Sequence, residues 1–344
     1  MKRTIYALIS AAMLASMPVF AQTTATIGAI QAGASTLVET LATALPFNST
    51  VGLNWSDAYI GQLLSVPPHF GVGVTVGATS VKAAGLTDLL SQLGVPSITI
   101  PAFLGDKLPL PVAVAEARIG GFLLPFDVGV KAGFIPDSAA ASLSEMLGGL
   151  KVNYLAAGAD IRLALVQQNI LLPSVIIGVG VNYMKGGLGK TLGSDLPLTY
   201  TAGSDTYNIL ATAPNVGLTW ESTVFDLKAQ VSKSLLIFTP YLGAGASYGM
   251  TKAGYKIEST VTYDKNGVPF TDTTDLINAL TSAGIAVPDL TASGITYQKT
   301  VTGFTYRAYG GLSINILVLK LDVTGLYNFS DGSIGASVGA RIQL

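Results

Sequence analysis

The sequence predicts an all-β fold, a transmembrane antiparallel β-barrel of about ten strands within a range of roughly 8 to 14. Between residues 126 and 344, segments of about ten residues alternate apolar with small or polar side chains, as residues 126–134 do. Successive residues of a strand point to opposite faces, so each segment has one apolar and one polar face. A soluble sandwich alternates too, but this chain also begins with an export signal. Only 11% of its residues are charged, against about 25% in soluble domains.

The N-terminus has the pattern of a secretory signal peptide. Lys2 and Arg3 precede an apolar run over residues 5–20, and Val19-Phe20-Ala21 fits the small-residue rule for cleavage. We expect residues 1–21 to be removed after Ala21 and the mature chain to reach the outer membrane of a Gram-negative bacterium. The chain contains no cysteine, so it folds without disulfides.

Residues 22–66 form a second predicted unit, which precedes the barrel of residues 67–344. Apolar residues at helical spacing predict an amphipathic helix over 26–45 that ends before Pro46. They are Ile27, Ile30, Leu37, Leu41 and Leu45. Two interpretations stay open for this unit, a periplasmic helical cap packed under the barrel or a plug that enters the lumen.

Ten strands are predicted from residue 69 onward. Their ranges are 69–79, 111–121, 125–134, 150–166, 173–185, 215–232, 239–250, 301–314, 319–328 and 333–344. No backbone group can stay unpaired inside a bilayer, so the sheet is expected to close on itself. Ten also meets the even strand number of single-chain bacterial barrels.

The lengths of the connections alternate, which supports this strand count. The long connections 80–110, 135–149, 186–214 and 251–300, together with the short Asn328–Gly332 turn, alternate with tight ones near 121–125, 167–172, 233–238 and 315–318. Barrels place short turns on the periplasmic side and long loops outside. Leucine-rich segments at 86–93, 143–150 and 276–280 predict short helices in the outer loops, which either form a lid or surround an apolar vestibule.

Aromatic residues near the outer strand ends predict a girdle at the membrane surface. They are Phe134, Tyr183, Tyr248, Tyr306 and Tyr327. The apolar phase of the strand at 215–232 slips between Val224 and Phe225, which predicts a bulge. Tyr154 also has the wrong parity for lipid.

The opposite faces of the strands give a list of charged side chains expected in the lumen. They are Glu116, Arg118, Asp127, Lys131, Asp160, Arg162, Asp226, Lys228, Arg307, Lys320, Asp322 and Arg341. A basic residue facing lipid at the midplane costs about 2–4 kcal/mol, so these residues are expected to point inward. They either fill a narrow barrel with ion pairs or form a selective constriction. Glycines on the same face leave space for the N-terminal segment, the arginines or a slender ligand.

The sequence lacks the usual catalytic groups. His69 is the one histidine, and it precedes the first strand, so we expect a polar rim residue rather than a general base. We expect no enzymatic activity, no cofactor, no metal site and no nucleic-acid partner.

Two stretches carry a resemblance to a known family. Gly52-Leu53-Asn54-Trp55 leads to residues 69–74, and residues 229–233 lead to residues 240–245. The chain resembles an uncharacterised family of outer-membrane barrels of Bacteroidetes and spirochaetes, which implies a barrel and no particular activity. Its layout is also similar to that of the fatty-acid transporter barrels.

Two functions are compatible with these features. The leading hypothesis is a narrow or plugged porin-like channel that binds or passes small hydrophobic molecules. The alternative is a structural or surface-interaction barrel with a closed lumen and no transport. In both, the expected partners are outer-membrane lipids and the barrel-assembly machinery, with a small hydrophobic ligand in the first.

Overall fold

A computed structural model describes residues 25–66, 68–82, 106–122, 124–135, 140, 141, 144, 149, 151–285 and 287–344. Ten antiparallel strands pair with their neighbours, and the last pairs with the first, so the sheet closes into a ring. They are β2 (Phe70–Lys82), β3 (Lys107–Gly120), β4 (Phe126–Phe134), β5 (Lys151–Val166), β6 (Ser174–Thr191), β8 (Asp205–Ser232), β9 (Phe238–Lys265), β12 (Gly294–Ile316), β13 (Leu319–Asn328) and β14 (Ile334–Gln343). The predicted fold class is confirmed.

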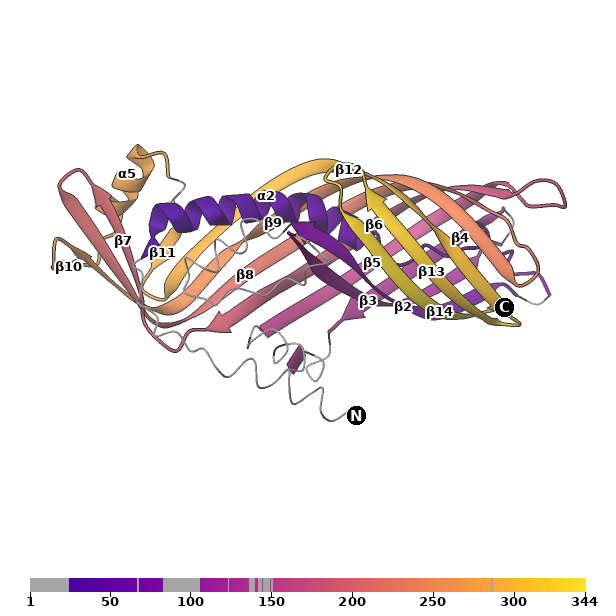
Figure 1. Ribbon diagram of the computed structural model, residues 1–344, viewed down its shortest axis with the longest axis horizontal. Helices are drawn as coiled ribbons and strands as arrows, with labels where there is room; N and C mark the ends of the chain where they lie inside the picture. The colour runs from indigo at the N-terminus through magenta and orange to yellow at the C-terminus, as the bar shows by residue number, and fades with distance from the viewer. Residues whose placement is uncertain are drawn as a thin grey trace.

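The two ends of the barrel differ in their connections. Short turns join β3 to β4, β5 to β6, β8 to β9 and β12 to β13 at the end where β2 begins and the chain ends (Figure 1). At this end, the backbone N–H of Leu344 donates to the carbonyl of Phe70 over 2.9 Å. We call this the short-turn end and the opposite one the long-loop end. The predicted alternation of connections therefore holds.

A belt of exposed apolar side chains surrounds the ring. In β4 the inward residues are buried and the outward ones become exposed towards Phe134, as the alternation predicts. The belt includes Val72, Val74, Val76, Val130, Phe134, Ile161, Val179, Val181, Phe225, Leu227, Leu242, Phe304, Tyr306, Val323, Ile334 and Val338. It follows that the outer surface of the ring is apolar, whereas its interior towards the short-turn end is polar.

The wall is uneven in height, because β8 and β9 continue far past the other strands of the ring towards the long-loop end. β8 and β9 each span 28 residues, whereas β4 spans nine. The prediction that residues 186–214 and 251–300 form loops is therefore wrong over most of their length. They are paired strands, including β7 (Leu196–Ala202), β10 (Val268–Phe270) and β11 (Asp289–Thr291), because their inner face buries apolar side chains.

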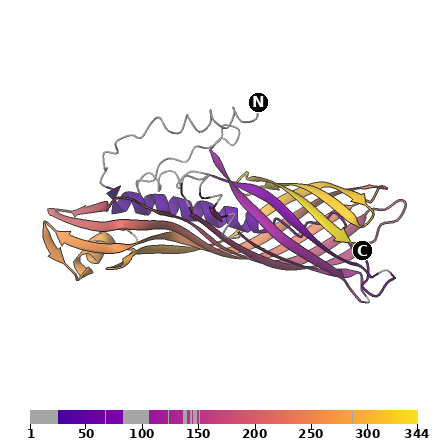
Figure 2. The same ribbon diagram turned by 90° about the horizontal axis from the view of Figure 1, so that it is seen from below.

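Helix α2 (Ile27–Ser49) lies along the inner face of this tall part of the wall (Figures 1 and 2). Its buried residues Leu37, Leu41 and Leu45 belong to the same apolar core as Trp220 and Tyr255 of the wall. The strand β1 (Ala25–Thr26) precedes the helix and pairs with β7. The helix thus fills the concave side of the sheet at the long-loop end.

Pro46 lies within α2, so the predicted helix end before this residue is wrong. Proline removes one backbone hydrogen bond, yet it is tolerated here in the last helical turn. The wall makes room for its ring at Gly249, where an added Cβ would lie only 2.4 Å from Pro46 Cγ. Packing against a glycine in the wall therefore lets the helix continue to Ser49.

The predicted bulge between Val224 and Phe225 is also wrong, because β6 and β8 pair without a shift there. The one irregularity of β8 against β9 lies between Thr212 and Asn215. Trp220 and Val224 point inward although they are apolar. The apparent slip arises because the interior changes from polar to apolar where α2 packs.

One of the predicted loop helices is described and is confirmed, namely α5 (Thr274–Ser282), which buries Leu276 and Leu280. The segments 86–93 and 143–150, like the signal peptide 1–21, lie wholly or mostly outside the described residues. No helix in the described part of the chain is long and apolar enough to cross a lipid bilayer.

Candidate functional site: the charged lumen and the segment that fills it

The chain between α2 and β2 runs through the lumen of the ring. Asn48, at the end of α2, donates to Thr79 Oγ1 of β2 over 2.8 Å, and Ile60 N donates to Asp127 Oδ2 of β4 over 3.2 Å. His69 then lies at the short-turn end, with its Nδ1 3.1 Å from the carbonyl oxygen of Leu344. We call residues 48–60 the lumen segment.

The centre of the lumen holds a buried network of five charged side chains. Arg118 contacts Asp127 over 2.6 Å and Asp160 over 2.7 Å. Arg162 reaches Asp127 over 2.8 Å, and Lys228 reaches Asp160 over 2.6 Å. Two carboxylates are thus shared among three cations, and the five side chains tie β3, β4, β5 and β8 together inside the ring.

A second pair lies on the adjoining wall, where Arg307 binds Asp226 through two nitrogens at 2.6 and 2.8 Å. Ser247 also donates to Asp226 over 2.7 Å. Charge-assisted bidentate bonds of this kind are stronger than neutral ones and fix geometry. The pair therefore joins β8, β9 and β12 across the lumen face.

A third group forms around Asp57 of the lumen segment. Lys320 and Arg341 contact this carboxylate over 2.8 and 2.9 Å, and Arg341 also pairs with Asp322. The twelve charged residues that the strand alternation directs inward all point into the ring; Lys320 and Asp322 are partly buried and the others are buried. Seven of the twelve are basic and five acidic, so the carboxylate of Asp57 offsets part of the positive excess.

Trp55 connects the lumen segment to the charged walls. Its Nε1 donates to Glu116 Oε2 over 2.5 Å. Its ring lies under two guanidinium groups, with Arg341 Cζ 4.7 Å and Arg118 Cζ 5.6 Å from the centroid. Cation–π contacts strengthen when they are shielded from water, so this buried indole holds two arginines at once.

The backbone of the lumen segment satisfies the remaining cations. The carbonyls of Ser49 and Val51 accept from Lys131 Nζ over 2.6 and 2.7 Å. Farther along, the carbonyl of Leu53 accepts from Lys228 over 3.1 Å, that of Trp55 from Gln230 over 2.9 Å, and that of Asp57 from Arg162 over 2.9 Å. Every second carbonyl from Ser49 to Asp57 thus faces donors from β4, β5 and β8, so the backbone of the segment takes the place of water around these groups.

The segment turns at two consecutive residues with left-handed backbone, Gly52 (φ 87°) and Leu53 (φ 58°). A side chain at Gly52 would meet Glu116 Oε1 and Val114 Cγ2 at 2.9 Å. Leucine rarely adopts this conformation, and such strain persists only where surrounding contacts impose it. Here the turn directs the carbonyl of Leu53 at Lys228.

Neighbouring side chains occupy the space beside the glycines of the inner wall. An added Cβ at Gly71 would lie 2.9 Å from the Trp55 ring, and one at Gly129 would lie 2.6 Å from Arg118 Nη2. Between the lumen segment and the wall a cavity of about 10 Å³ lies beside Lys131 and Asp226, room for about one water molecule. The segment and the long arginines therefore take up the space that the glycines leave.

The inward charges follow from the strand alternation, as does the inward position of Gln230 on β8, but the places of Trp55 and Asp57 do not. Trp55 belongs to one of the two stretches that carry the family resemblance, and nothing in its spacing indicates a lumen contact. The described residues contain no group of three or more His, Cys, Asp or Glu that could hold a metal ion.

No protein-family model and no curated protein sequence matches this chain. Among solved structures it is similar to the outer membrane protease OmpT from Escherichia coli, at 12% identity, TM-score 0.41, and coverage of 82% of this chain and 99% of that one. It is also similar to the transport unit of the autotransporter AIDA-I from Escherichia coli, at 12% identity, TM-score 0.35, and coverage of 91% and 97%. For the Pseudomonas putida toluene transporter TodX the values are 9%, 0.26, 80% and 88%. The resemblance to a family of Bacteroidetes and spirochaetes stays a prediction.

Proposed function

We propose that this chain is an outer-membrane barrel with a plugged lumen, which conducts only when the lumen segment leaves it. The single observation that carries this proposal is the path of residues 48–60 through the ring. Trp55, Asp57 and five backbone carbonyls of this segment meet the inward charges. The segment is joined to the wall by noncovalent contacts and by its connection to β2, so it can move without breaking the barrel.

The location in a membrane is supported by the apolar belt. On β6 the outward residues are largely apolar from the start of the strand to Tyr183, and Lys185 follows. Roughly eleven residues tilted at about 45° rise about 25 Å, close to the apolar band of a transmembrane barrel. The predicted signal peptide agrees with export.

The class of permeant follows from the two halves of the interior. The half near the short turns is lined by buried ions, so once opened it suits small ions and polar solutes rather than apolar molecules. The half near the long loops is apolar and is covered by α2. A small hydrophobic ligand therefore has a binding surface there only if it displaces α2, and it has no apolar path through the ring.

Single-channel recording in planar lipid bilayers tests this proposal. We expect the full mature chain to be silent, a variant lacking residues 25–60 to give steady current, and the double variant Trp55→Ala, Asp57→Asn to open in brief bursts. Glu39→Gln is the control, because Glu39 pairs with Lys299 over 3.3 Å on the exposed side of α2. If the double variant and the deletion variant both fold yet neither conducts, the channel proposal is wrong.

A second function is favoured by the tall part of the wall. β8 and β9 are more than twice as long as the roughly 9–11 residues that a tilted strand needs to cross a bilayer. This extension carries α2, α5 and its own apolar core, and it could serve surface interaction with no transport. The test is to remove residues 196–202 together with 268–291 and to measure how strongly cells that carry this variant bind to a partner surface. Binding equal to that of cells with the original chain would count against this function. Neither function requires catalysis, and we propose none.

A further inference from the structure

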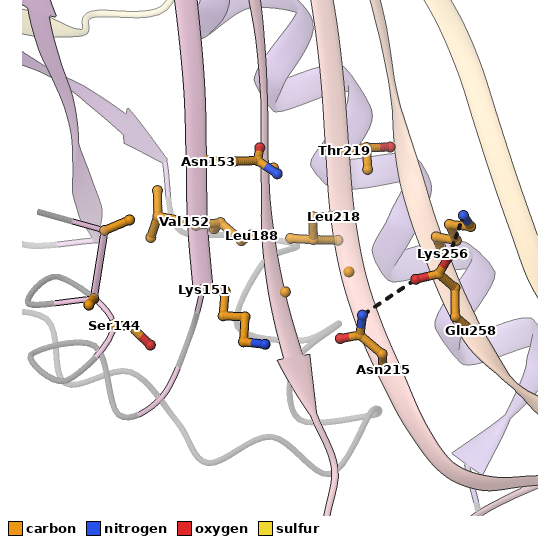
Figure 3. A pocket seen from close by; sticks show the side chains of 15 residues that line it. Ser144, Lys151, Val152, Asn153, Leu188, Asn215, Leu218, Thr219, Lys256 and Glu258 are labelled. Carbon is orange, nitrogen blue, oxygen red and sulfur yellow. Dashed lines mark hydrogen bonds and ion pairs between the residues drawn. The ribbon is translucent and has the colours of Figure 1, made fainter. Parts of the chain in front are cut away.

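A cavity with charged residues in its lining lies on the outward face of the tall wall, on the side of the sheet opposite α2 (Figure 3). Its volume is about 760 Å³, and it continues into a second hollow of about 480 Å³. Lys151, Asn153, Asn215, Lys256 and Glu258 line the first. On β6 and β8, Leu188 and Leu218 alternate with outward residues and turn inward to the core that includes α2. This cavity is therefore separate from the lumen, and its size is that of a ligand site.

Glycines leave the floor of this cavity bare. Gly189 and Gly217 lie side by side in the pairing of β6 with β8. A Cβ added at Gly217 would meet no atom nearer than 3.4 Å, and one at Gly189 none nearer than 3.7 Å. Packing in this structure does not require glycine at either position. The space above them is open for another molecule.

The second hollow begins at the edge of the apolar belt. Lys185, Glu221 and Lys252 stand opposite one another in one cross-strand row, and all three are exposed. Four residues closer to the short-turn end, the same strands present Val181, Phe225 and Tyr248 to the outside. Charge thus replaces apolar surface within about 13 Å along the strands. At this edge, Tyr183 donates its hydroxyl proton to Glu221 Oε1 over 2.9 Å.

The combined surface is cationic. Four lysines (Lys151, Lys185, Lys252 and Lys256) face two carboxylates, those of Glu221 and Glu258, in a chain whose net charge is −1. Glu258 is paired with Lys256 over 2.5 Å. Lys185 and Lys252 lie two strands apart, about 10 Å, and Lys256 lies four residues beyond Lys252, about 13 Å. Spread cations of this kind match a ligand with more than one anionic group.

We propose that this surface binds the phosphorylated sugar headgroup of a glycolipid in the outer leaflet. The proposal rests on the proposed outer-membrane location. The apolar belt directly below would contact the acyl chains, the lysines would bind the phosphates at the membrane edge, and the glycine floor would receive the sugar. Lysines near a membrane surface attract anionic headgroups in this way. A soluble anion would gain nothing from the belt.

The experiment measures binding of lipid A, a diphosphorylated acylated disaccharide, to the full mature chain in detergent by native mass spectrometry. The test variant is Lys185→Gln, Lys252→Gln, Lys256→Gln. We expect it to bind lipid A about 100-fold more weakly, from the loss of three lysine–phosphate contacts. The matched control is Lys82→Gln, an exposed lysine at the far end of β2, four strands away from both β6 and β9. It should bind like the original chain.

Two further ligands identify the source of the phosphate. Dephosphorylated lipid A should bind as weakly to the original chain as lipid A binds to the triple variant. Inorganic phosphate should not displace lipid A at equal concentration. Three results would overturn the proposal. The first is equal binding of lipid A by the original chain and the triple variant, and the second is equal binding of lipid A and dephosphorylated lipid A by the original chain. The third is displacement of lipid A by inorganic phosphate. The conductance of the variant lacking residues 25–60 is independent of these outward lysines, so the two proposals fail separately.

Discussion

Asp127 shows how a single side chain joins the strands of the wall to the lumen segment. Its carboxylate has no exposed surface and accepts hydrogen bonds from Arg118, Arg162 and the backbone of Ile60. Burying charges is costly unless each is paired and hydrogen-bonded. Each hydrogen bond of Asp127 therefore offsets part of the free-energy cost of burying the guanidinium groups of Arg118 and Arg162. The lumen segment contributes to that balance through Ile60.

Asp127→Ala should lower the free energy of unfolding by about 3–5 kcal/mol, because it leaves the buried Arg162 without a carboxylate and removes one of the two carboxylates that Arg118 contacts. Urea-induced unfolding in lipid vesicles measures the change. Glu258→Gln is the control, since its pair with Lys256 is about half exposed, and exposed pairs contribute about 0–1 kcal/mol. Similar losses for the two variants would show that the central network is not what stabilises the ring.

At the scale of elements, the strands that form the ring are predictable from the sequence, and the tall part of the wall is not. The alternation of β4 is visible because one face meets apolar surroundings and the other meets ions. In β8 the inward residues Trp220 and Val224 are apolar, since that face meets α2, so the alternation becomes ambiguous. The end of α2 was unpredictable for a similar reason, because Gly249 makes room for Pro46 only through contact across the fold.

Leu45→Ala should destabilise the long-loop half, because Leu45 has no exposed surface and lies in the core between α2 and the wall. Removing buried methyl groups leaves a cavity and costs about 2–5 kcal/mol. In a Trp55→Phe background, Trp220 is the one remaining tryptophan and reports this half by fluorescence during unfolding. Leu64→Ala, at a side chain 68% exposed, should leave the transition in place; a shift as large as that of Leu45→Ala would contradict the packing described.

At the scale of the whole molecule, the closed ring and the grouping of short turns at one end were predictable, and the path of residues 48–60 was not. Transmembrane barrels tend to have short turns at one end and longer loops at the other, so the spacing of ten strands restricts the topology. The lumen segment is held largely by backbone carbonyls, which every residue has, so no side-chain pattern indicates its place. The sequence could only leave the cap and the plug as alternatives.

A disulfide between the lumen segment and the wall tests the central claim most directly. The backbone N of Ala58 lies 3.2 Å from Ser232 Oγ, and the chain has no cysteine of its own. In Ala58→Cys, Ser232→Cys, we expect an intramolecular disulfide in intact cells, detected as a linked peptide by mass spectrometry. The control Ala58→Cys, Ser222→Cys moves the wall partner ten residues along β8, about 33 Å, and should stay reduced. A linked control, or an unlinked Ala58–Ser232 pair in folded protein, would contradict a lumen filled by its own N-terminal segment.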